Sequence, residues 1–376
     1  MTTSACDACL RRTWLIARLA GRIEVARHEG AQSTRTRLRE ILALGEKRLI
    51  AGLACTDAAA IRSELHEVEP DALRAECRRA RITPVCRHDA NYPARLLDLS
   101  DPPAVLHVLG APERLAQLAG GAIDDGPAAV SIVGTRRASA DGLEVARGLG
   151  RGLGAAGVTV VSGMALGVDS AAHAGALEVG GATIAVLAGG ADRPYPPSKR
   201  PLHRAIAERH AVVSELPPGA APRKWCFPAR NRIIAALGGM TVVVEAAERS
   251  GSLITAECAA DVGREVAAVP GAVTAWRSRG TNALLRDGAT LVRDARDVLD
   301  ATVGVEASAA LDLDPGAGLE PRLSSVLRAV AEGRDTLASL AGAPDQAQPM
   351  LAALTELELL GLLRRVPGGR YVVAAG

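Results

Sequence analysis

Residues 129–136 have the sequence Ala-Val-Ser-Ile-Val-Gly-Thr-Arg, in which a short, mostly β-branched run ends in a glycine turn. Residues 158–169 repeat this arrangement as Val-Thr-Val-Val-Ser-Gly-Met-Ala-Leu-Gly-Val-Asp, and a helical stretch lies between the two runs. Strands that alternate with helices form βαβ units, in which the strands are parallel. These two stretches therefore predict an α/β domain built on a doubly wound sheet.

The alternation of short apolar runs and helical stretches continues to residue 300. Four further strands are expected at residues 183–187, 211–213, 240–244 and 265–269. Residues 82–127 add two short strands that are interrupted by Tyr-Pro and Asp-Pro-Pro sequences. Parallel strands of this kind are joined by right-handed crossovers, so the pattern predicts a mostly parallel sheet.

The two ends of the chain predict separate modules. Apolar residues recur at helical spacing over residues 1–80, which predicts a helical domain ahead of the α/β domain at 81–300. Residues 301–319 are small and acidic and contain Gly and Pro, which is typical of a linker. Residues 320–376 contain three helix-like stretches and a two-stranded ending, which predicts a winged helix. Its six basic and six acidic residues cancel, which favours protein contact over DNA reading.

Aromatic residues are scarce, since the 376 residues include one Phe, three Trp and three Tyr. This count excludes a broad stacking platform of the kind found in RNA-binding sheets. Only Lys47, Lys199 and Lys224 are Lys among 44 basic residues, and such an Arg-rich composition indicates genomic base bias more than nucleic-acid binding. The net charge of +2 provides no global attraction for polyanions, so any basic site must be local.

Membrane segments and disulfides are not expected. No apolar stretch is long enough to span a bilayer, and the N-terminus lacks the apolar segment of a signal peptide, which predicts a cytoplasmic protein. The seven Cys are scattered along a chain that is long enough to fold without disulfides. Cys6 and Cys9 form a lone CxxC motif with no obvious second ligand pair, so we expect reduced thiols and no metal, with a zinc site as the less favoured alternative.

Glycine-rich turns follow three of the expected strands, at residues 134–136, 162–164 and 250–252. Small residues let a backbone approach a ligand, and a helix N-terminus adds unpaired N–H groups. The carboxyl ends of parallel strands share one edge of the sheet, so these turns favour a phosphate-bearing ligand there. The formal GxGxxG motif at residues 152–157 precedes a strand, and no Lys follows a Gly, so ordinary NAD and P-loop chemistry lose support.

Residues 223–232, Arg-Lys-Trp-Cys-Phe-Pro-Ala-Arg-Asn-Arg, combine four basic side chains with the chain's only Phe. Basic side chains neutralise phosphates and a rigid aromatic ring stacks on bases, which is what a path for a single strand requires. The alternative is that Trp225 and Phe227 anchor the core and that Arg230 and Arg232 are surface charges. The segment by itself leaves both interpretations open.

A cluster of acidic residues and a His provides a competing interpretation as a metal or acid/base site. Asp169 and His173 are four residues apart on one helix face, which suits a pair of ligands, and Glu215 and Glu245 follow other strands. The commoner use of such a pair is helix capping and a buried hydrogen bond, which is the interpretation that we favour.

A series of short motifs runs in order from residue 91 to residue 282. It comprises Asn91-Tyr92-Pro93, Asp101-Pro102-Pro103, Val133-Gly134-Thr135-Arg136, Ser162-Gly163-Met164-Ala165, Tyr195-Pro196, Ser214-Glu215, Phe227-Pro228, Arg230-Asn231-Arg232, Ser250-Gly251-Ser252, Val269-Pro270-Gly271, Gly280 and Asn282. This series resembles the bacterial DNA-processing protein A (DprA, also called Smf) family. The N-terminal helices, which would be a SAM/HhH-like domain, the linker and the winged-helix tail also fit that family's plan.

The resemblance implies an extended Rossmann-like domain that binds and protects incoming single-stranded DNA. It further implies a homodimer that helps to load RecA recombinase during natural transformation, with no cofactor and no enzymatic activity. Carried onto this sequence, it makes Arg136 a phosphate anchor, Lys224 a second cation and Phe227 a base-stacking or wedge residue. The DNA-binding residues that it implies are Gly134, Thr135, Arg136, Ser162, Gly163, Met164, Lys224, Phe227, Arg230, Asn231, Arg232, Ser250, Gly251 and Ser252.

Three alternatives stay open beside this interpretation. Arg230 and Arg232 could fix the loop by pairing with Glu215 or Glu245. The chain could be a nucleotide hydrolase similar to the nucleoside-monophosphate phosphoribohydrolases, although residues 245–252 lack the PGGxGTxxE motif with the catalytic Glu of those enzymes. The end domains could also make the chain chiefly an interaction scaffold.

Overall fold

A nine-stranded sheet forms the centre of the computed structural model, which describes residues 5–28, 34–110, 112, 115–119, 129–304, 319–331, 333–343, 346–366 and 368–373. The strands lie in the order β1-β2-β6-β5-β4-β3-β7-β8-β9. From β6 across to β9 they are parallel, whereas β1 and β2 are antiparallel at one edge. Their bounds are β1 (Ile82–Cys86), β2 (Val105–Gly110), β3 (Val130–Val133), β4 (Val160–Ser162), β5 (Thr183–Val186), β6 (Ala211–Ser214), β7 (Met240–Val243), β8 (Glu265–Ala268) and β9 (Thr290–Leu291).

The mostly parallel, doubly wound sheet expected from the sequence is confirmed. Eight strands coincide with the expected runs to within two residues at either end. The ninth, β9, was not expected, because two partly exposed residues carry no periodic pattern. The chain adds β4, β5 and β6 on one side of β3 and then β7, β8 and β9 on the other side. The strand order therefore reverses between β3 and β7, and folds of this type bind ligands at such a point.

Helices cover both faces of the sheet. Val130 and Ile132 of β3 point to one face, where they pack in a core with α8 and α9. Ser131, between them, points to the other face and donates a hydrogen bond to the carbonyl of Ile234 at 2.7 Å. This alternation follows from the two-residue period of a strand. The helices of this region are α7 (Leu115–Leu118), α8 (Ala140–Ala155), α9 (Val168–Glu178), α10 (Arg200–Arg209), α11 (Cys226–Leu237), α12 (Gly251–Asp261), α13 (Arg279–Arg286) and α14 (Ala295–Val303).

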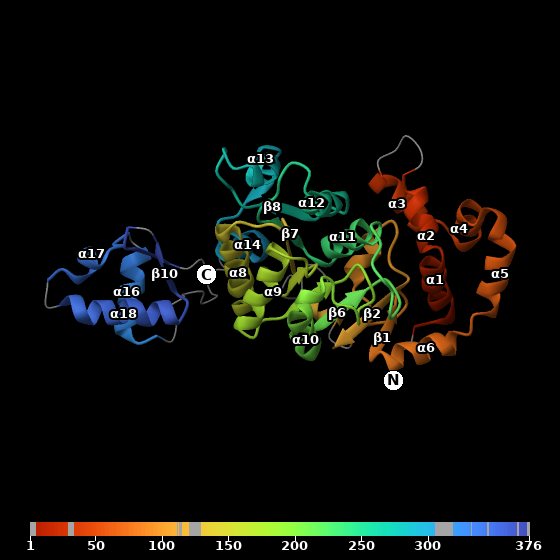
Figure 1. The fold of residues 1–376 in the computed structure, drawn as a ribbon, viewed down its shortest axis with the longest axis horizontal. Coiled ribbons are helices and arrows are strands. Elements are labelled where there is room, and N and C mark those ends of the chain that lie inside the picture. Colours follow the sequence, from red (N-terminus) through yellow and green to blue (C-terminus); the bar gives the residue numbers. More distant parts are fainter. Residues whose placement is uncertain are drawn as a thin grey trace.

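The N-terminal residues form the expected group of helices, which lies on the right in Figure 1 beside α11 and the β1–β2 edge of the sheet. Leu15, Leu19 and Ile23 share a buried core with Trp225, which is only 1% exposed. The indole Nε1 of Trp225 donates to the carbonyl of Ala20 at 2.9 Å, so the two regions are packed through a common core. The helices are α1 (Asp7–Arg18), α2 (Ala20–Ala26), α3 (Thr34–Ala43), α4 (Glu46–Leu53), α5 (Ala58–Glu67) and α6 (Pro70–Arg79).

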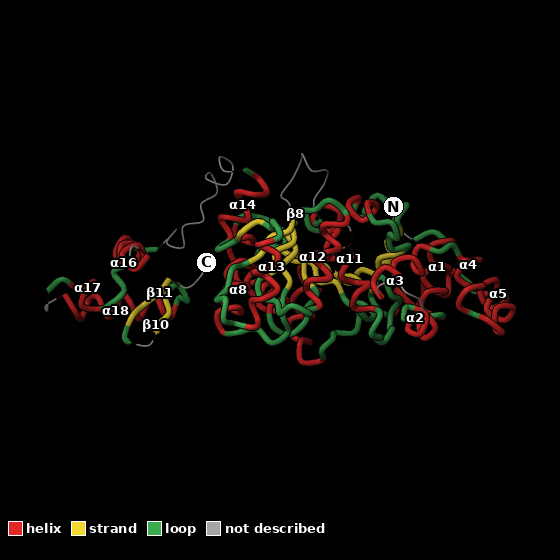
Figure 2. Tube along the Cα trace, turned by 90° about the horizontal axis from the view of Figure 1, so that it is seen from above, coloured by secondary structure: helices red, strands yellow, loops and turns green. Residues whose placement is uncertain are grey.

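The C-terminal residues form a separate unit with its own core, on the left in Figures 1 and 2. Three helices, α16 (Pro321–Ala331), α17 (Leu337–Ala341) and α18 (Ala347–Leu359), precede the antiparallel pair β10 (Leu363–Val366) and β11 (Arg370–Val373). This agrees with the expected helices and two-stranded ending, and the winged-helix assignment stays a prediction. Of the expected linker, residues 301–303 belong to α14, and residues 305–318 lie outside the described residues. Among the described residues, no helix is long and apolar enough to cross a membrane.

Candidate nucleic-acid interface

A cavity of about 210 Å³ lies where the strand order reverses, at the carboxyl ends of β3, β4 and β7. The first turns of α11 and α12 complete its walls. It brings together eight of the residues expected to bind DNA, although Gly134 and Ser252, the first and last of them, are 118 positions apart in the sequence. These eight are Gly134, Arg136, Phe227, Arg230, Asn231, Ser250, Gly251 and Ser252.

The turn after β3 is held tightly, so that Arg136 leaves it in a defined direction. A Cβ atom on Gly134 would lie 2.6 Å from a methyl carbon of Val168, so only glycine fits there without a shift. The backbone N–H of Thr135 donates to the carbonyl of Glu245 at 2.7 Å, and its own carbonyl accepts from the N–H of Val168 at 3.3 Å. Thr135 therefore fixes the turn while the side chain of Arg136 lies exposed at the cavity.

The turn after β7 presents a helix N-terminus to the cavity. Ser250 caps α12, because its Oγ accepts from the backbone N–H of Ser252 at 3.4 Å. The side chain of Asn231 on α11 donates to the carbonyl of Gly251 at 3.1 Å and ties the two helices together. The first N–H groups of a helix have no intrahelical partners and carry its positive dipole end, so this wall favours an anion.

An aromatic ring, Phe227, lines the cavity and packs against a second ring, Tyr195. The rings of Phe227 and Tyr195 lie 5.6 Å apart in a tilted arrangement. The guanidinium carbon of Arg136 lies 5.1 Å from the centre of the Phe227 ring, within the range of a cation–π contact. A phosphate-binding cation and a stacking surface are thus adjacent.

The floor of the cavity carries its own compensating charges. The guanidinium of Arg230 lies 3.9 Å from the carboxylate of Asp169, and it donates to the carbonyls of Gly163 and Val186, the latter at 3.1 Å. Burial raises the pKa of the Asp169 carboxyl, and the nearby Arg230 opposes this rise. Burial likewise lowers the pKa of Arg230, and Asp169 opposes that change. Of the two cations that line the cavity, Arg230 is therefore already paired, whereas Arg136 is exposed.

Comparison with known proteins matches the model of the DNA recombination-mediator protein A family over residues 83–303, which include every wall of this cavity. The chain belongs to this family. The putative DNA processing protein DprA of Mycobacterium tuberculosis is 41% identical over 289 residues, which cover 75% of this chain and 72% of that protein.

Two solved structures of the same family share the fold. DNA processing protein A from Streptococcus pneumoniae superposes with a TM-score of 0.61 at 31% identity, covering 78% of this chain and 96% of that one. The corresponding protein from Helicobacter pylori, whose structure was described for its single-stranded DNA binding mode, has a TM-score of 0.52 at 29% identity. That alignment covers 59% of this chain and 95% of the H. pylori chain.

In this member of the recombination-mediator family, the turn after β4 supports the cavity from behind. The hydroxyl of Ser162 donates to the carbonyl of Ile132 at 2.6 Å, and the side chain of Met164 has no exposed surface. The backbone N–H of Gly163, expected to be a ligand donor, instead donates to the carboxylate of Asp169 at 3.2 Å. Ser162, Gly163 and Met164 are therefore placed behind the lining residues.

Arg232 is also placed away from the cavity, on the opposite side of α11. Its side chain is 2% exposed, with Nε 3.0 Å from a carboxylate oxygen of Asp101 and a terminal nitrogen 2.7 Å from Glu215. The two acidic residues raise the pKa of Arg232 more than burial lowers it. Pairing with Glu215, the structural alternative for this residue, is the arrangement found.

The aromatic and basic residues at the start of α11 divide in the same way. Trp225 is the core anchor described above, whereas Phe227 is only partly buried and lies at the cavity. Lys224 is exposed on the turn before α11 and does not line the cavity. Tyr195 was not expected as a site residue. Because the chain has only seven aromatic residues, each of them could have been considered as a candidate for base stacking from the sequence.

The acidic residues considered as a metal or acid/base site do not form one cluster. Asp169 binds backbone N–H groups, Glu215 pairs with Arg232, and Glu245 accepts from the backbone N–H of Ser139 at 2.8 Å. His173 is buried with its Nδ1 2.6 Å from the hydroxyl of Thr183, and burial lowers its pKa to about 3. His173 has the buried hydrogen-bond role favoured from the sequence, whereas Asp169 binds the turn before α9 and does not cap that helix, so the capping role was wrong.

Proposed function

We propose that this chain is a single-stranded DNA-binding protein that protects incoming DNA and loads RecA recombinase in recombination, including natural transformation. The observation that carries the proposal is the exposed guanidinium of Arg136 above the ring of Phe227, at a cavity walled by the N-terminus of α12. Binding of single-stranded DNA by the H. pylori relative supports it. The recombinase partner, the homodimer and the cytoplasmic setting are carried over from the family resemblance.

The two sides of the cavity suit the two parts of a nucleotide. Arg136 and the N–H groups of α12 suit a backbone phosphate, and Phe227 with Tyr195 offers a surface for an unpaired base. A base in a duplex is already stacked and paired, so it reaches such a surface only after unpairing. The site therefore favours single strands over duplexes.

The aromatic pair also limits what the site can recognise. Two partly exposed rings accommodate one or two bases, and stacking accepts any base because every base has a π-face. The proposed contacts therefore give little sequence preference. Because the net charge of the chain is only +2, the affinity depends on local cations and not on a general field.

Titration of a fluorescent oligothymidine at several salt concentrations, followed by anisotropy, tests the proposal. Each phosphate contact contributes about 0.7 to the slope of log affinity against log salt. At 0.1 M salt we expect Arg136→Glu to lower single-strand affinity by about tenfold and to make the slope shallower by about 0.7. A duplex of the same length should bind more weakly than the single strand to the parent protein.

Arg209→Glu is the matched control for the charge reversal. Arg209 is an exposed residue at the end of α10, directly before β6 begins, so it lies at the edge of the sheet opposite the cavity. We expect this variant to bind like the parent. Equal affinities for Arg136→Glu and the parent, or equal losses in both variants, would refute the site. Release of a free base from nucleoside monophosphates by the parent would favour the hydrolase alternative instead.

A further inference from the structure

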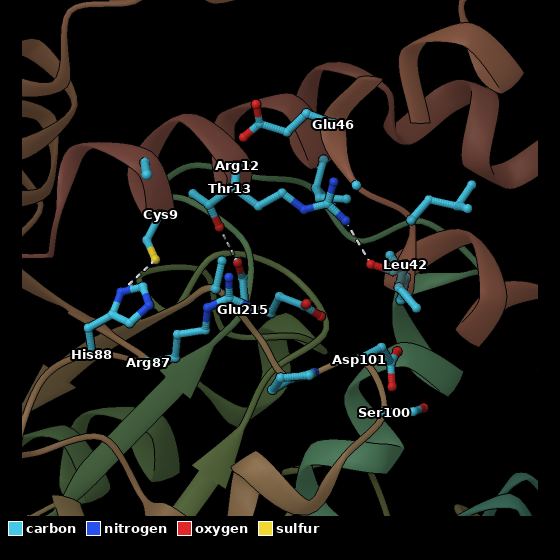
Figure 3. A pocket seen from close by; sticks show the side chains of 17 residues that line it. Cys9, Arg12, Thr13, Leu42, Glu46, Arg87, His88, Ser100, Asp101 and Glu215 are labelled. Carbon is cyan, nitrogen blue, oxygen red and sulfur yellow. Dashed lines mark hydrogen bonds between the residues drawn. The ribbon is translucent and has the colours of Figure 1, made fainter. Parts of the chain in front are cut away.

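Four residues that are distant in the sequence meet at the N-terminus of α1. Cys6 precedes this helix and Cys9 lies in its first turn, while Cys86 ends β1 and His88 follows two residues later. One ligand atom from each of the four lies within 4.8 Å of the other three. Figure 3 shows Cys9 on α1 directed at the ring of His88. We propose that these four side chains form a structural zinc site.

The distances agree with a tetrahedral centre. The Nδ1 atom of His88 lies 3.5 Å from the sulfur of Cys6 and 3.5 Å from the sulfur of Cys9. Zinc bonds of about 2.3 Å to sulfur and about 2.0–2.1 Å to nitrogen, separated by the tetrahedral angle, place these atoms about 3.6 Å apart. The Nδ1 atom of His88 is thus at the spacing from both sulfurs that a bound zinc ion requires, and all four ligand atoms lie within 4.8 Å of one another.

The ligand set selects the metal by its chemistry. Three thiolates and one imidazole are soft and borderline donors, which suit Zn²⁺ and disfavour Mg²⁺ or Ca²⁺. All four tetrahedral positions are filled by the protein, so no position remains for water or substrate. The site therefore has the closed coordination of a structural centre and not the open one of a catalytic centre.

Two of the four proposed ligands are buried. Cys9 and Cys86 are buried in a small apolar core with Leu10 and Val105, whereas His88 is exposed. Leu10 donates its backbone N–H to the carbonyl of Cys6 at 3.1 Å, which fixes the CxxC segment at the start of the helix.

The position of the site indicates what the metal would do. His88 is 82 residues after Cys6, so one ion would connect the first helix of the N-terminal region to the edge strand of the sheet. A cavity of about 280 Å³ lies beside this connection, between α1 and the loops around Asp101 and Glu215. A cross-link that closes a long loop restricts the unfolded chain, so the metal would stabilise the docking of α1.

The sequence concealed this site because its ligands come from two segments. Cys6 and Cys9 have the familiar CxxC spacing. The second pair of ligands, Cys86 and His88, belongs to a CxH sequence, and only the fold shows that this sequence lies beside the CxxC motif. Among the described residues, this is the one group of His, Cys and acidic side chains close enough together to hold a metal ion.

The test is the zinc content of the full chain, purified through a tag without histidine from cells grown with added zinc and measured by mass spectrometry of the element. We expect about one zinc per chain in the parent. Cys9→Ser and Cys86→Ser should each bind at least about tenfold less metal than the parent, since each variant removes one of the three thiolate ligands. His88→Cys should retain zinc, because it keeps four ligands.

Cys77→Ala is the matched control, since Cys77 is a buried thiol on α6 of the same region but is not one of the four ligands. It should retain zinc like the parent. The parent refolded with Co²⁺ should also show the thiolate-to-cobalt charge-transfer band of a tetrahedral site, a readout that does not depend on whether any variant folds.

Three results would overturn the proposal. The first is less than about 0.1 zinc per parent chain together with no charge-transfer band. The second is unchanged zinc in both Cys9→Ser and Cys86→Ser, which would place the ion elsewhere. The third is a disulfide between Cys6 and Cys9 in the isolated protein, detected as five free thiols instead of seven.

Discussion

Replacing Arg232 with Met removes the cation between two buried carboxylates while keeping a side chain of similar length. Arg232 is 2% exposed, Asp101 has no exposed side-chain surface, and that of Glu215 is 14% exposed. Removing one partner of a buried ion pair costs about 3–5 kcal/mol, because the remaining charge is left uncompensated. We expect about 3 kcal/mol here, the lower end, since Arg39 stays 4.0 Å from Asp101.

This loss has a defined thermal and pH signature. For a domain of 150–250 residues, each kcal/mol shifts the unfolding midpoint by about 2–4 °C, so Arg232→Met should unfold about 6–12 °C below the parent. Burial raises the pKa of Asp101 and of Glu215, and Arg232 opposes both shifts. Without Arg232 the folded-state pKa values rise further above those of the unfolded chain. The stability of the variant is then greatest at low pH and falls as pH rises through the folded-state pKa values.

The assay is thermal unfolding at pH 5.5 and pH 8, followed by tryptophan fluorescence, to which the buried Trp225 contributes. The deficit of Arg232→Met against the parent should be larger at pH 8 than at pH 5.5. Arg209→Met, which alters an exposed cation, should leave the midpoint unchanged. A midpoint within about 2 °C of the parent combined with a tenfold loss of single-strand affinity would refute the reasoning and return Arg232 to the DNA-binding residues.

Three further predictions concern the cavity and the C-terminal unit. Phe227→Ala should weaken binding of single-stranded DNA by about 1–3 kcal/mol without changing the salt slope, as measured by anisotropy; a changed slope would indicate loss of a phosphate contact. Gly163→Ala should lower both the unfolding midpoint and DNA affinity, because its Cβ would overlap the guanidinium of Arg230; parent-like values of both would show that the turn tolerates a side chain. A chain ending at residue 319 should bind DNA like the parent but fail to load RecA onto DNA, since the C-terminal unit has a core of its own; loss of DNA binding would contradict this.

Local patterns were sufficient to predict most of the fold. Short, mostly β-branched runs such as residues 130–133 and the glycines that follow the strands are local features, so they are visible in the sequence. The parallel sheet follows from the helices between these runs. The strand β9 was missed because its two residues are too few and too exposed for any pattern.

The candidate site was predicted less completely. The three glycine turns and the basic segment at residues 223–232 indicated where the ligand would lie, but not which side chains would be free to contact it. Met164 and Ser162 belong to a strand-end motif of the expected kind, yet both are fully covered by neighbouring elements. Burial depends on the whole packing around a residue, which no short motif contains.

Residue type and local pattern therefore determined the sheet, its helices and the edge at which a ligand would bind. Only the tertiary structure decided the roles of Arg230 and Arg232, because positions two apart on a helix face nearly opposite directions. Arg230 faces the cavity floor and Asp169, whereas Arg232 faces Asp101 and Glu215. The proposed zinc site follows the same rule, since its two halves are brought together by the docking of α1 on the edge of the sheet and by no feature of the neighbouring sequence.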